Sequence, residues 1–362
     1  MCGICGFNSE NKELIRKMAA VIKYRGPDQS GFYLDANISL GHRRLSIIDL
    51  SKKGKQPMFN EDGSICIVYN GEVYNFKELR GDLERKGHKF YSNTDTEVII
   101  HAYEEYGKKC VEYFNGMFAF AIYDSIKKEI FISRDRIGIK PLYYYIKDNK
   151  FAFASEIKSI LEDKQIKRDV NLDALNKFIT FRYIPEGETI FKNIYRLLSG
   201  HCISYDLKKN KIRIQKYWDL DISNKNILNK SEYYFKKRIR ELLKDSVRKR
   251  LISDVPLGVY LSGGLDSSSV LAMMRDLNHN DKIKTFSVGF EHDVIGNELK
   301  YAKKVSEYFK TDHKEFLIKS DVIKLLPKII QHLDEPMSDP ATIPNYVLSE
   351  NAKKDVTVVL TG

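Results

Sequence analysis

The sequence predicts two domains, an α+β domain followed by an α/β domain built on a parallel sheet. A length of 362 residues corresponds to about two domains. Up to residue 155 short strands follow one another closely, with helices grouped between them, as in stacked layers. After residue 230 strands and helices alternate, which is typical of right-handed crossovers between parallel strands. The expected boundaries are residues 1–210 for the first domain, 211–230 for a linker and 231–362 for the second domain.

The composition excludes several classes of protein. Hydrophobic residues make up 43% and charged residues 30%, as in an ordinary globular chain rather than a disordered one. No uncharged apolar run reaches the roughly 18 residues that a membrane-spanning helix needs, and five cysteines do not make a disulfide scaffold. The net charge of +11 comes from 60 basic against 49 acidic residues. In the densest basic stretch, 236–250, apolar residues recur at the spacing of one buried helix face, so nucleic-acid binding is the less favoured interpretation.

The N-terminus carries the first candidate for chemistry. Met1-Cys2-Gly3 lacks the pattern of a signal peptide, and a small second residue lets the initiator Met be removed. Cys2 would then carry a free α-amine, with a pKa of about 7.7–8.0, that can serve its thiol as a general base. Cys2 could instead be a small buried residue at the start of a strand. A zinc or redox pair with Cys5 is disfavoured because no second Cys pair or His cluster has metal-site spacing.

The first domain is expected to contain short elements in quick succession. An apolar β-branched strand over 65–69 stops at Asn70-Gly71, a turn signal. Amphipathic helices then follow over 76–86 and 96–106, and strands over 117–123, 129–133, 142–146 and 151–154. The stretch 171–218 is expected to be irregular, and the polar segment 219–230 belongs to the predicted linker.

The second domain is expected to alternate regularly. The pattern predicts helices over 231–251, 267–277, 298–309 and 321–332, and strands over 257–261, 283–288, 314–317 and 356–360. Ligands of such sheets bind beyond the carboxyl ends of the strands, where the following helices begin. The loops after these strands are therefore the places to look for a site.

One of these loops has a specific sequence. The strand ending at Leu261 runs into Ser262-Gly263-Gly264-Leu265-Asp266-Ser267-Ser268 and then a helix. Glycines permit close backbone approach, and serine hydroxyls with amides at a helix N-terminus favour an anion. The Gly-Lys-Ser/Thr ending of a Walker A loop is absent. The loop resembles the pyrophosphate-binding loop of enzymes that split ATP into AMP and pyrophosphate, in which Asp266 would hold Mg²⁺.

Taken together, these motifs give a resemblance to the glutamine-hydrolysing asparagine synthetases over essentially the whole chain. The ordered set carries the resemblance, because any one short string could arise by chance. It consists of Cys2–Ile4, Arg25–Asp28, Gly41–Asp49, Asn70–Asn75, Asp95–Glu97, Met117–Ala121, Arg134–Gly138, Ser262–Ser268, Phe286–Gly289 and Val358–Gly362.

The resemblance implies an N-terminal-nucleophile hydrolase fold of stacked αββα layers for the first domain. Cys2 would attack the side-chain amide of glutamine, with the Asn70 side chain and the Gly71 N–H as oxyanion hole. Arg44 would pair with the substrate carboxylate, whereas Asp95 and Glu72 would receive its ammonium group. The backbone of Leu45, Ser46, Ile47 and Ile48 would line the site. The plainer alternatives are a surface ion pair of Arg44 with Asp95 and a hairpin turn at Asn70-Gly71.

For the second domain the resemblance implies that aspartate attacks ATP. This gives β-aspartyl-AMP and pyrophosphate, and ammonia from the first domain then displaces AMP. Leu261 and Val288 would contact the adenine or ribose, and Thr361 and Gly362 the adenylate. Asp334-Glu335 is expected to be a solvated helix end, with a place near this crevice as the alternative. Arg25–Asp28 either orders a loop over the glutamine pocket or forms a simple turn.

The chain departs from the family pattern at its C-terminal end. The family continues with Gly-Glu-Gly-x-Asp-Glu, whereas this sequence ends at Gly362. The expectation is therefore a chain that hydrolyses glutamine but forms little asparagine. The nearest alternative function is an amidotransferase for another carboxylate in antibiotic or surface-polymer synthesis, and a catalytically dead binding or regulatory protein is a further one. The expected location is the cytoplasm, without membrane or nucleic-acid partners, and the family precedent suggests a homodimer.

Overall fold

A computed structural model of the chain describes residues 1–185, 187–223, 230–278, 282–291, 298–318 and 322–362. The chain divides into two compact units. Unit 1 comprises Met1–Leu220 together with Asp334–Ser338, and unit 2 comprises Asp221–Leu333 and Asp339–Gly362. The short segment 334–338 thus belongs to unit 1, although it connects two helices of unit 2.

Unit 1 contains two six-stranded sheets in which all described pairs are antiparallel. The first sheet has the order β10-β8-β9-β1-β3-β2, and the second has the order β12-β11-β7-β6-β5-β4. The strands of the first sheet are β1 (Gly3–Phe7), β2 (Gln29–Asp35), β3 (Ile38–Arg44), β8 (Tyr143–Lys147), β9 (Lys150–Ala154) and β10 (Ile194–Arg196). Those of the second are β4 (Met58–Phe59), β5 (Ile65–Val73), β6 (Gly116–Asp124), β7 (Glu129–Arg134), β11 (His201–Asp206) and β12 (Lys211–Lys216).

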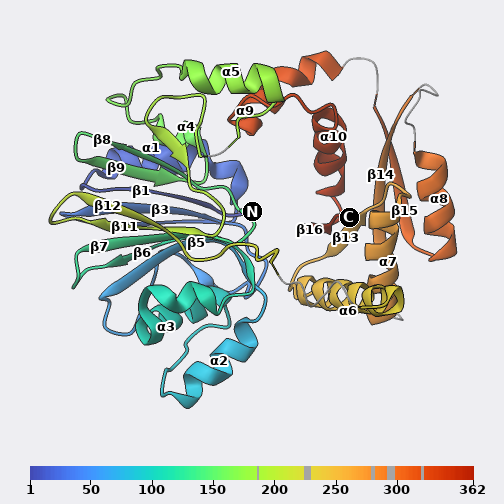
Figure 1. The fold of residues 1–362 in the computed structure, drawn as a ribbon, viewed down its shortest axis with the longest axis horizontal. Helices are drawn as coiled ribbons and strands as arrows, with labels where there is room; N and C mark the ends of the chain where they lie inside the picture. The colour runs from blue at the N-terminus through green and yellow to red at the C-terminus, as the bar shows by residue number, and fades with distance from the viewer. Residues whose placement is uncertain (186, 224–229, 279–281, 292–297, 319–321) are drawn as a thin grey trace. The chain divides into compact units, whose positions relative to one another are not determined.

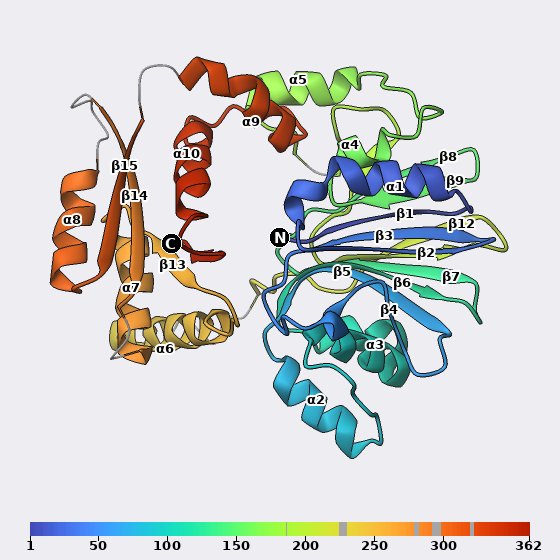
Figure 2. The same cartoon turned by 180° about the vertical axis from the view of Figure 1, so that it is seen from behind.

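Helices cover the outer face of each sheet in unit 1 (Figures 1 and 2). The helices α1 (Lys12–Val21) and α4 (Ile157–Ile160) pack on the first sheet through one apolar cluster. On the other side, α3 (Asp95–Tyr106) lies against the second sheet and α2 (Phe76–Arg85) packs on α3, and α5 (Leu172–Phe181) follows later in the chain. A further apolar cluster, which includes Ile4, Val68 and Ile132, fills the space between the sheets. The unit therefore has the predicted αββα layers, confirming the expected fold class.

Unit 2 is a four-stranded parallel sheet with the order β15-β14-β13-β16. Its strands are β13 (Leu257–Tyr260), β14 (Lys284–Phe290), β15 (Asp312–Ile318) and β16 (Val358–Leu360). Its helices are α6 (Glu232–Arg250), α7 (Leu265–Leu277), α8 (Leu299–Tyr308), α9 (Leu326–Leu333) and α10 (Thr342–Ala352). Residues of α6, α7 and α8 form the apolar core on one face, and α10 packs on the other (Figure 1). This is the predicted α/β arrangement.

Several local expectations were wrong. The strand predicted to stop before Asn70 continues to Val73, because Asn70 and Gly71 pair with Ala119 and Phe118 of β6. The stretch 171–218 is not irregular, since it contains α5, β10, β11 and β12. Lys211–Lys216, placed in the linker by the sequence, form β12 by pairing with β11.

The basic helix and the C-terminal region also differ from expectation. Of the predicted apolar face of α6 only Val247 is buried, whereas Ile239 and Leu242 are exposed. Helix α10 was missed because Pro344 and its weak apolar periodicity conceal it. The predicted start of a helix at Asp321 and residues 224–229 of the predicted linker lie outside the described residues. Among the described helices, none is long and apolar enough to cross a membrane.

Candidate functional site

Cys2 immediately precedes β1, so the central strand of the first sheet fixes its backbone. Its Sγ donates to the Leu45 carbonyl at 3.6 Å and accepts from the Leu45 amide at 3.4 Å. Burial raises the pKa of the Cys2 thiol, and the positive N-terminal amine, the Leu45 amide, Arg44 and Lys140 act against that rise. A thiol in these surroundings needs a local base to become a nucleophile, which its own α-amine would supply.

The loop that follows β3 is held by Arg44 and Asp28. The Arg44 guanidinium donates to the Ser51 carbonyl at 2.9 Å, to Gln29 Oε1 at 3.3 Å and to the carbonyls of Ile48 and Asp49. The Asp28 carboxylate accepts from the Ser46 amide at 2.8 Å. Arg44 is not in a surface ion pair, because its side chain is buried and its donors point into this loop. Of the two interpretations of Arg25–Asp28, the contacts favour the one in which the segment orders a loop.

Asn70 and Gly71 lie side by side on β5 in the second sheet. The Asn70 side chain is 1% exposed, and neither its Nδ2 nor its Oδ1 has a hydrogen-bond partner within the described structure. Buried amides are almost always paired, so two orphaned polar atoms indicate a place where another group is to bind. A Cβ at Gly71 would lie 2.2 Å from the Met117 carbonyl oxygen, so only glycine fits. The hairpin-turn alternative is wrong, because both residues pair across the sheet.

Two carboxylates lie near this strand. Asp95 begins α3 and accepts from the Tyr69 hydroxyl at 2.7 Å and from the Val73 amide at 2.9 Å. Burial raises the pKa of Asp95 despite these hydrogen bonds. Glu72 is also buried, one residue beyond Gly71 on β5. Hydrogen bonds thus tie the start of α3 to the strand that carries Asn70.

A buried lysine that the sequence analysis missed lies at the same site. Lys140 is 4% exposed, and burial lowers its pKa, against the opposing effects of Glu72 and Cys2. Its backbone amide and those of Ile137 and Ile139 bond to the Asp135 carboxylate. The sequence signal was a lone lysine directly before Pro141 and after Arg134–Gly138, which alone does not distinguish it from a surface lysine.

Electrostatic interactions connect these groups into one site in unit 1. Cys2 interacts with Arg44 and Lys140, Arg44 with Asp95, and Lys140 with Glu72. Of the sequence-predicted residues, Arg44 and Leu45 thus neighbour the Cys2 sulfur directly, whereas Asp95 and Glu72 are connected to it through Arg44 and Lys140. Leu45, Ser46, Ile47 and Ile48 contribute backbone to the same loop, as Leu45 and Ser46 show by their hydrogen bonds.

The second candidate site lies in unit 2, in the Ser262–Ser268 loop between β13 and α7. Ser262 Oγ accepts from the Gly264 amide at 3.2 Å and lies 3.0 Å from Ser267 Oγ. Gly263 has a positive φ of 81°, and a Cβ there would lie 2.5 Å from the Ala302 amide. The Ser262 contacts thus hold the loop at the start of the 13-residue helix α7, and Gly263 lies against α8 (Leu299–Tyr308). The N-terminal amides of α7 favour an anion.

The end of β16 lies against this loop. A Cβ at Gly362 would lie 2.3 Å from the Ser267 amide, so Thr361-Gly362 passes directly beside the start of α7. The Leu261 amide donates a hydrogen bond to the Phe286 carbonyl at 2.8 Å, and Val288 lies two residues further along β14. The chain leaves β13 for β14 on one side and reaches β16 on the other, so the loop sits at a topological switch point.

Asp266 is the predicted ligand of Mg²⁺. It is an exposed residue in the first turn of α7, next to the serine hydroxyls of the loop. Mg²⁺ prefers one or two carboxylates together with substrate phosphates and water, and a single exposed carboxylate at an anion-binding loop fits that preference. When bound with ATP, the ion would neutralise charge on the phosphates.

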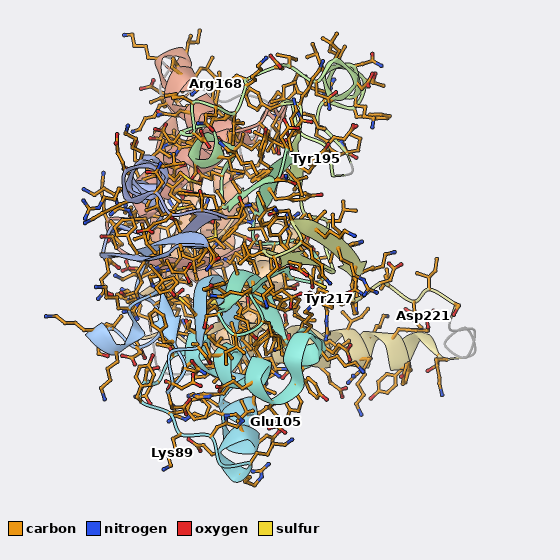
Figure 3. The ribbon with its side chains drawn as sticks, turned by 90° about the vertical axis from the view of Figure 1, so that its left-hand side faces the viewer. Lys89, Glu105, Arg168, Tyr195, Tyr217 and Asp221 are labelled. Carbon is orange, nitrogen blue, oxygen red and sulfur yellow. The ribbon has the colours of Figure 1, made fainter. Side chains whose placement is uncertain are left out.

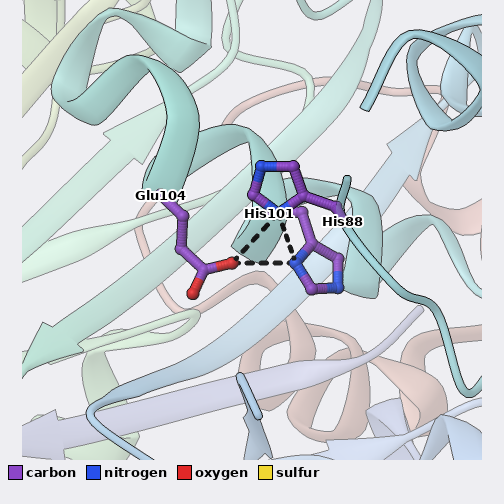
Figure 4. Close-up of side chains that lie close together, drawn as sticks. All are labelled: His88, His101 and Glu104. Atoms are coloured by element: carbon purple, nitrogen blue, oxygen red, sulfur yellow. Dashed lines mark hydrogen bonds and ion pairs between the residues drawn. The ribbon is translucent and has the colours of Figure 1, made fainter. Parts of the chain in front are cut away.

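A third cluster lies in unit 1 between α2 and α3 (Figure 4). His88 Nδ1 lies 3.2 Å from His101 Nδ1, which lies 2.8 Å from a Glu104 oxygen. Burial opposes a charge on His101, but hydrogen bonds to Glu104 and Glu97 raise its pKa to about 9. Glu105, labelled on α3 in Figure 3, faces the other nitrogen of His88 at 3.5 Å. A proton on His101 therefore accounts for the arrangement without a metal ion.

The comparisons with known proteins match both parts of the chain. Residues 1–218 match the model of the glutamine amidotransferase domain, and residues 238–362 match that of asparagine synthase. The fold and these matches thus define a glutamine amidotransferase with an αββα domain, joined to an α/β domain of the asparagine synthase type. The chain belongs to the family of glutamine-hydrolysing asparagine synthetases.

Several relatives match along the full length of this chain. A putative asparagine synthetase [glutamine-hydrolyzing] 2 of Methanocaldococcus jannaschii is 43% identical over 391 residues, covering 100% of this chain and 74% of the relative. Asparagine synthetase [glutamine-hydrolyzing] 1 of Bacillus subtilis is 36% identical and matches 100% of this chain and 57% of its own length. A solved structure of glutamine phosphoribosylpyrophosphate amidotransferase from B. subtilis covers 87% of this chain and 81% of its own, with 13% identity and a TM-score of 0.46.

Proposed function

We propose that the protein releases ammonia from glutamine at Cys2 and uses it to convert ATP-activated aspartate to asparagine, as an AMP-forming carbon–nitrogen ligase. The observation that carries the glutamine-hydrolysis step is the side-chain amide of Asn70 on β5. This amide is buried and has no hydrogen-bond partner in the described structure. Both family matches support the two halves of the reaction. Activity and substrates of the whole enzyme are inferred here from relatives of which this chain covers 74% and 57%.

The chemistry at Cys2 follows from its surroundings. Once Met1 is removed, the α-amine takes the thiol proton, and the sulfur attacks the amide carbon of glutamine. The developing oxyanion accepts hydrogen bonds from Asn70 Nδ2 and the Gly71 N–H. Collapse of the tetrahedral intermediate breaks the carbon–nitrogen bond, and the protonated amine returns its proton to the departing ammonia. Water then cleaves the thioester to glutamate.

The charges around the sulfur suit the ends of free glutamine. Arg44 interacts electrostatically with both Cys2 and Asp95, so a negative group lies near the positive group that neighbours the sulfur. An α-amino acid presents the complementary pair, a carboxylate and an ammonium group. We therefore assign the α-carboxylate to Arg44 and the α-ammonium to Asp95 and Glu72.

In unit 2 the Ser262–Ser268 loop would receive the pyrophosphate portion of ATP. The amides at the start of α7 and the hydroxyls of Ser262 and Ser267 provide donors for its oxygens. Thr361-Gly362, which pass beside the same helix turn, would contact the adenylate, and Leu261 with Val288 the adenine or ribose. Asp266 is the residue that would hold Mg²⁺.

A glutamine-like electrophile tests the proposal directly. The purified protein is treated with 6-diazo-5-oxo-norleucine, and the labelled peptide is identified by mass spectrometry. The expected result is one adduct on Cys2 of a chain that has lost Met1, together with glutamine-dependent ammonia release that Cys2→Ala abolishes. Cys5→Ala is the matched control, because that thiol is fully buried and bonds to the Gly41 carbonyl. An adduct on another cysteine, or activity in Cys2→Ala, would refute the assignment.

Aspartate is the favoured acceptor because the relatives quoted above carry the name asparagine synthetase. Pyrophosphate release is measured with ATP and glutamine in the presence of aspartate and of other carboxylates. Stimulation by aspartate alone supports the proposal, whereas stimulation by another carboxylate would favour the alternative amidotransferase. We place the reaction in the cytoplasm, where ATP and reduced thiols are available, and expect a homodimer, which light scattering would detect.

A further inference from the structure

The segment between α9 and α10 carries two acidic residues that are not the expected solvated helix end. The side chains of Asp334 and Glu335 are only 7% and 10% exposed, and both residues belong to unit 1. Glu335 accepts from the Tyr143 hydroxyl at 2.9 Å and from Arg196 at 2.6 Å. Asp334 and Glu335 thus contact residues of unit 1, although they lie between two helices of unit 2 in the sequence.

Asp334 is bonded to the start of α4. Its carboxylate accepts from the backbone amides of Ile157 and Lys158, the latter at 3.1 Å. It also lies 3.4 Å from the Lys158 ammonium group. Asp334 adopts a positive φ of 68°, a backbone conformation that non-glycine residues rarely keep unless their surroundings impose it.

From Lys158 a chain of charged contacts continues to the nucleophile. Lys158 donates to one oxygen of Glu156 at 2.6 Å, and the other oxygen accepts from Arg25 at 2.7 Å. Arg25 Nε in turn donates to the Cys2 carbonyl oxygen at 2.9 Å. The side chains of Arg25, Glu156 and Lys158 are 9%, 6% and 15% exposed, so water screens these contacts little.

We propose that Asp334 is a positioning residue for the glutaminase reaction, acting on Cys2 through Lys158, Glu156 and Arg25. The last of these contacts, from Arg25, holds the carbonyl of Cys2, and the α-amine and thiol of Cys2 must face each other for the reaction. Rotation of that peptide moves both groups, and small misplacements of reacting groups are costly. Residues 334–338 lie between α9 and α10, so the segment that contains Asp334 is covalently continuous with two helices of unit 2. The inference rests on the proposed function of Cys2.

The test compares Asp334→Asn and Asp334→Ala with Asp339→Asn. Asparagine retains an acceptor for the α4 amides but loses the charge. Asp339 is an exposed residue of the same region, and its carboxylate accepts from the Ala341 amide at 2.9 Å. We expect kcat for glutamine hydrolysis to fall about tenfold in Asp334→Ala, with KM for glutamine nearly unchanged, since the chemical step and not binding is affected. Asp334→Asn should show a smaller loss, and Asp339→Asn none.

A second readout does not depend on turnover. The rate at which iodoacetamide alkylates Cys2, followed by mass spectrometry against pH, reports the sulfur and its neighbouring amine. We expect the rate and its pH midpoint to change in Asp334→Ala and to stay as in the wild type in Asp339→Asn. An unchanged alkylation profile in folded Asp334→Ala, or an equal loss in Glu335→Gln, would overturn the proposal. If the wild type itself hydrolyses no glutamine, the proposed function fails, while the alkylation profile still decides the role of Asp334.

Discussion

The backbone of Leu45 contacts the Sγ of Cys2 through both of its polar groups, the carbonyl at 3.6 Å and the amide at 3.4 Å. The carbonyl accepts from a thiol, whereas the amide donates to a thiolate. The sulfur thus has a partner in either protonation state without a change of rotamer. Loss of the proton requires a base but no rearrangement of the loop after β3.

Replacing Asn70 by alanine should lower the rate of glutamine hydrolysis without lowering the stability of the fold. Removal of one oxyanion donor typically costs about 2.7–4 kcal/mol of transition-state stabilisation, so kcat for ammonia release should fall by about 10²–10³. The melting temperature should stay the same or rise, because the amide is buried without a partner in the described structure. Parallel calorimetry and ammonia assays check both statements. A large drop in melting temperature would mean that Asn70 is a structural residue.

Replacing Gly71 by alanine should destabilise unit 1. The added Cβ would lie 2.2 Å from the Met117 carbonyl oxygen, and the paired strand cannot yield without losing hydrogen bonds. Overpacking of this kind costs about 1–3 kcal/mol. Gly81→Ala on α2 is the control, since its Cβ would meet only Arg85 at 3.9 Å and should stabilise by about 0.5–1 kcal/mol. Urea unfolding of both variants measures the difference, and equal stabilities would contradict the prediction.

Two neighbouring glycines make a matched pair in unit 2. Gly263→Ala would place a methyl group 2.5 Å from the Ala302 amide at a positive φ, so the loop should shift and pyrophosphate binding should weaken. At Gly264 a Cβ meets only Ser262 Oγ at 3.3 Å, and Gly264→Ala should bind nearly as well as wild type. Isothermal titration with Mg²⁺-pyrophosphate measures this, and glutamine hydrolysis should be unchanged in both variants. Equal binding by the two variants would remove the loop from the anion site.

His101 should make the stability of unit 1 depend on pH. Its pKa in the folded protein is raised to about 9 by hydrogen bonds to Glu104 and Glu97 that outweigh burial, above the ordinary value of about 6.5. The contribution is therefore complete below pH 6.5 and is lost as the pH rises through 9. Its size is on the order of 1–3 kcal/mol. Thermal unfolding of wild type and His101→Gln between pH 6 and 10 should show a difference that shrinks with rising pH, and a constant difference would contradict this account.

Much of the fold could be predicted because its elements have strong local signals. The helices observed as α2 and α3 and the strands β6, β7, β8 and β9 agree with the expected ranges within a few residues. The prediction ended β5 too early because Asn70-Gly71 resembles a turn, whereas pairing with the neighbouring strand β6 continues through both residues. The β10–β12 region was missed because its strands are short and partly exposed, so alternation is weak.

The candidate sites were found by two routes. Residue types alone singled out Cys2 and the Ser262–Ser268 loop, whereas Asn70 was named only through the resemblance to the family, and the roles of all three stay predictions. Lys140 was missed and Asp334 was expected at a solvated helix end, because a single lysine or aspartate is usually a surface residue. Their positions depend on contacts between segments more than one hundred residues apart, and no local pattern encodes such contacts.

The continuity of β5 from Ile65 to Val73 limits where related chains can tolerate insertions. Asn70, Gly71 and Glu72 lie on one strand, and the amide of Val73 at its end holds Asp95. Inserting a single residue between Ile65 and Val73 would turn every later side chain to the opposite side of the sheet. Insertions should therefore be confined to connections such as the exposed turn near Ile126, and a library of one-residue insertions selected for growth without asparagine would reveal that boundary.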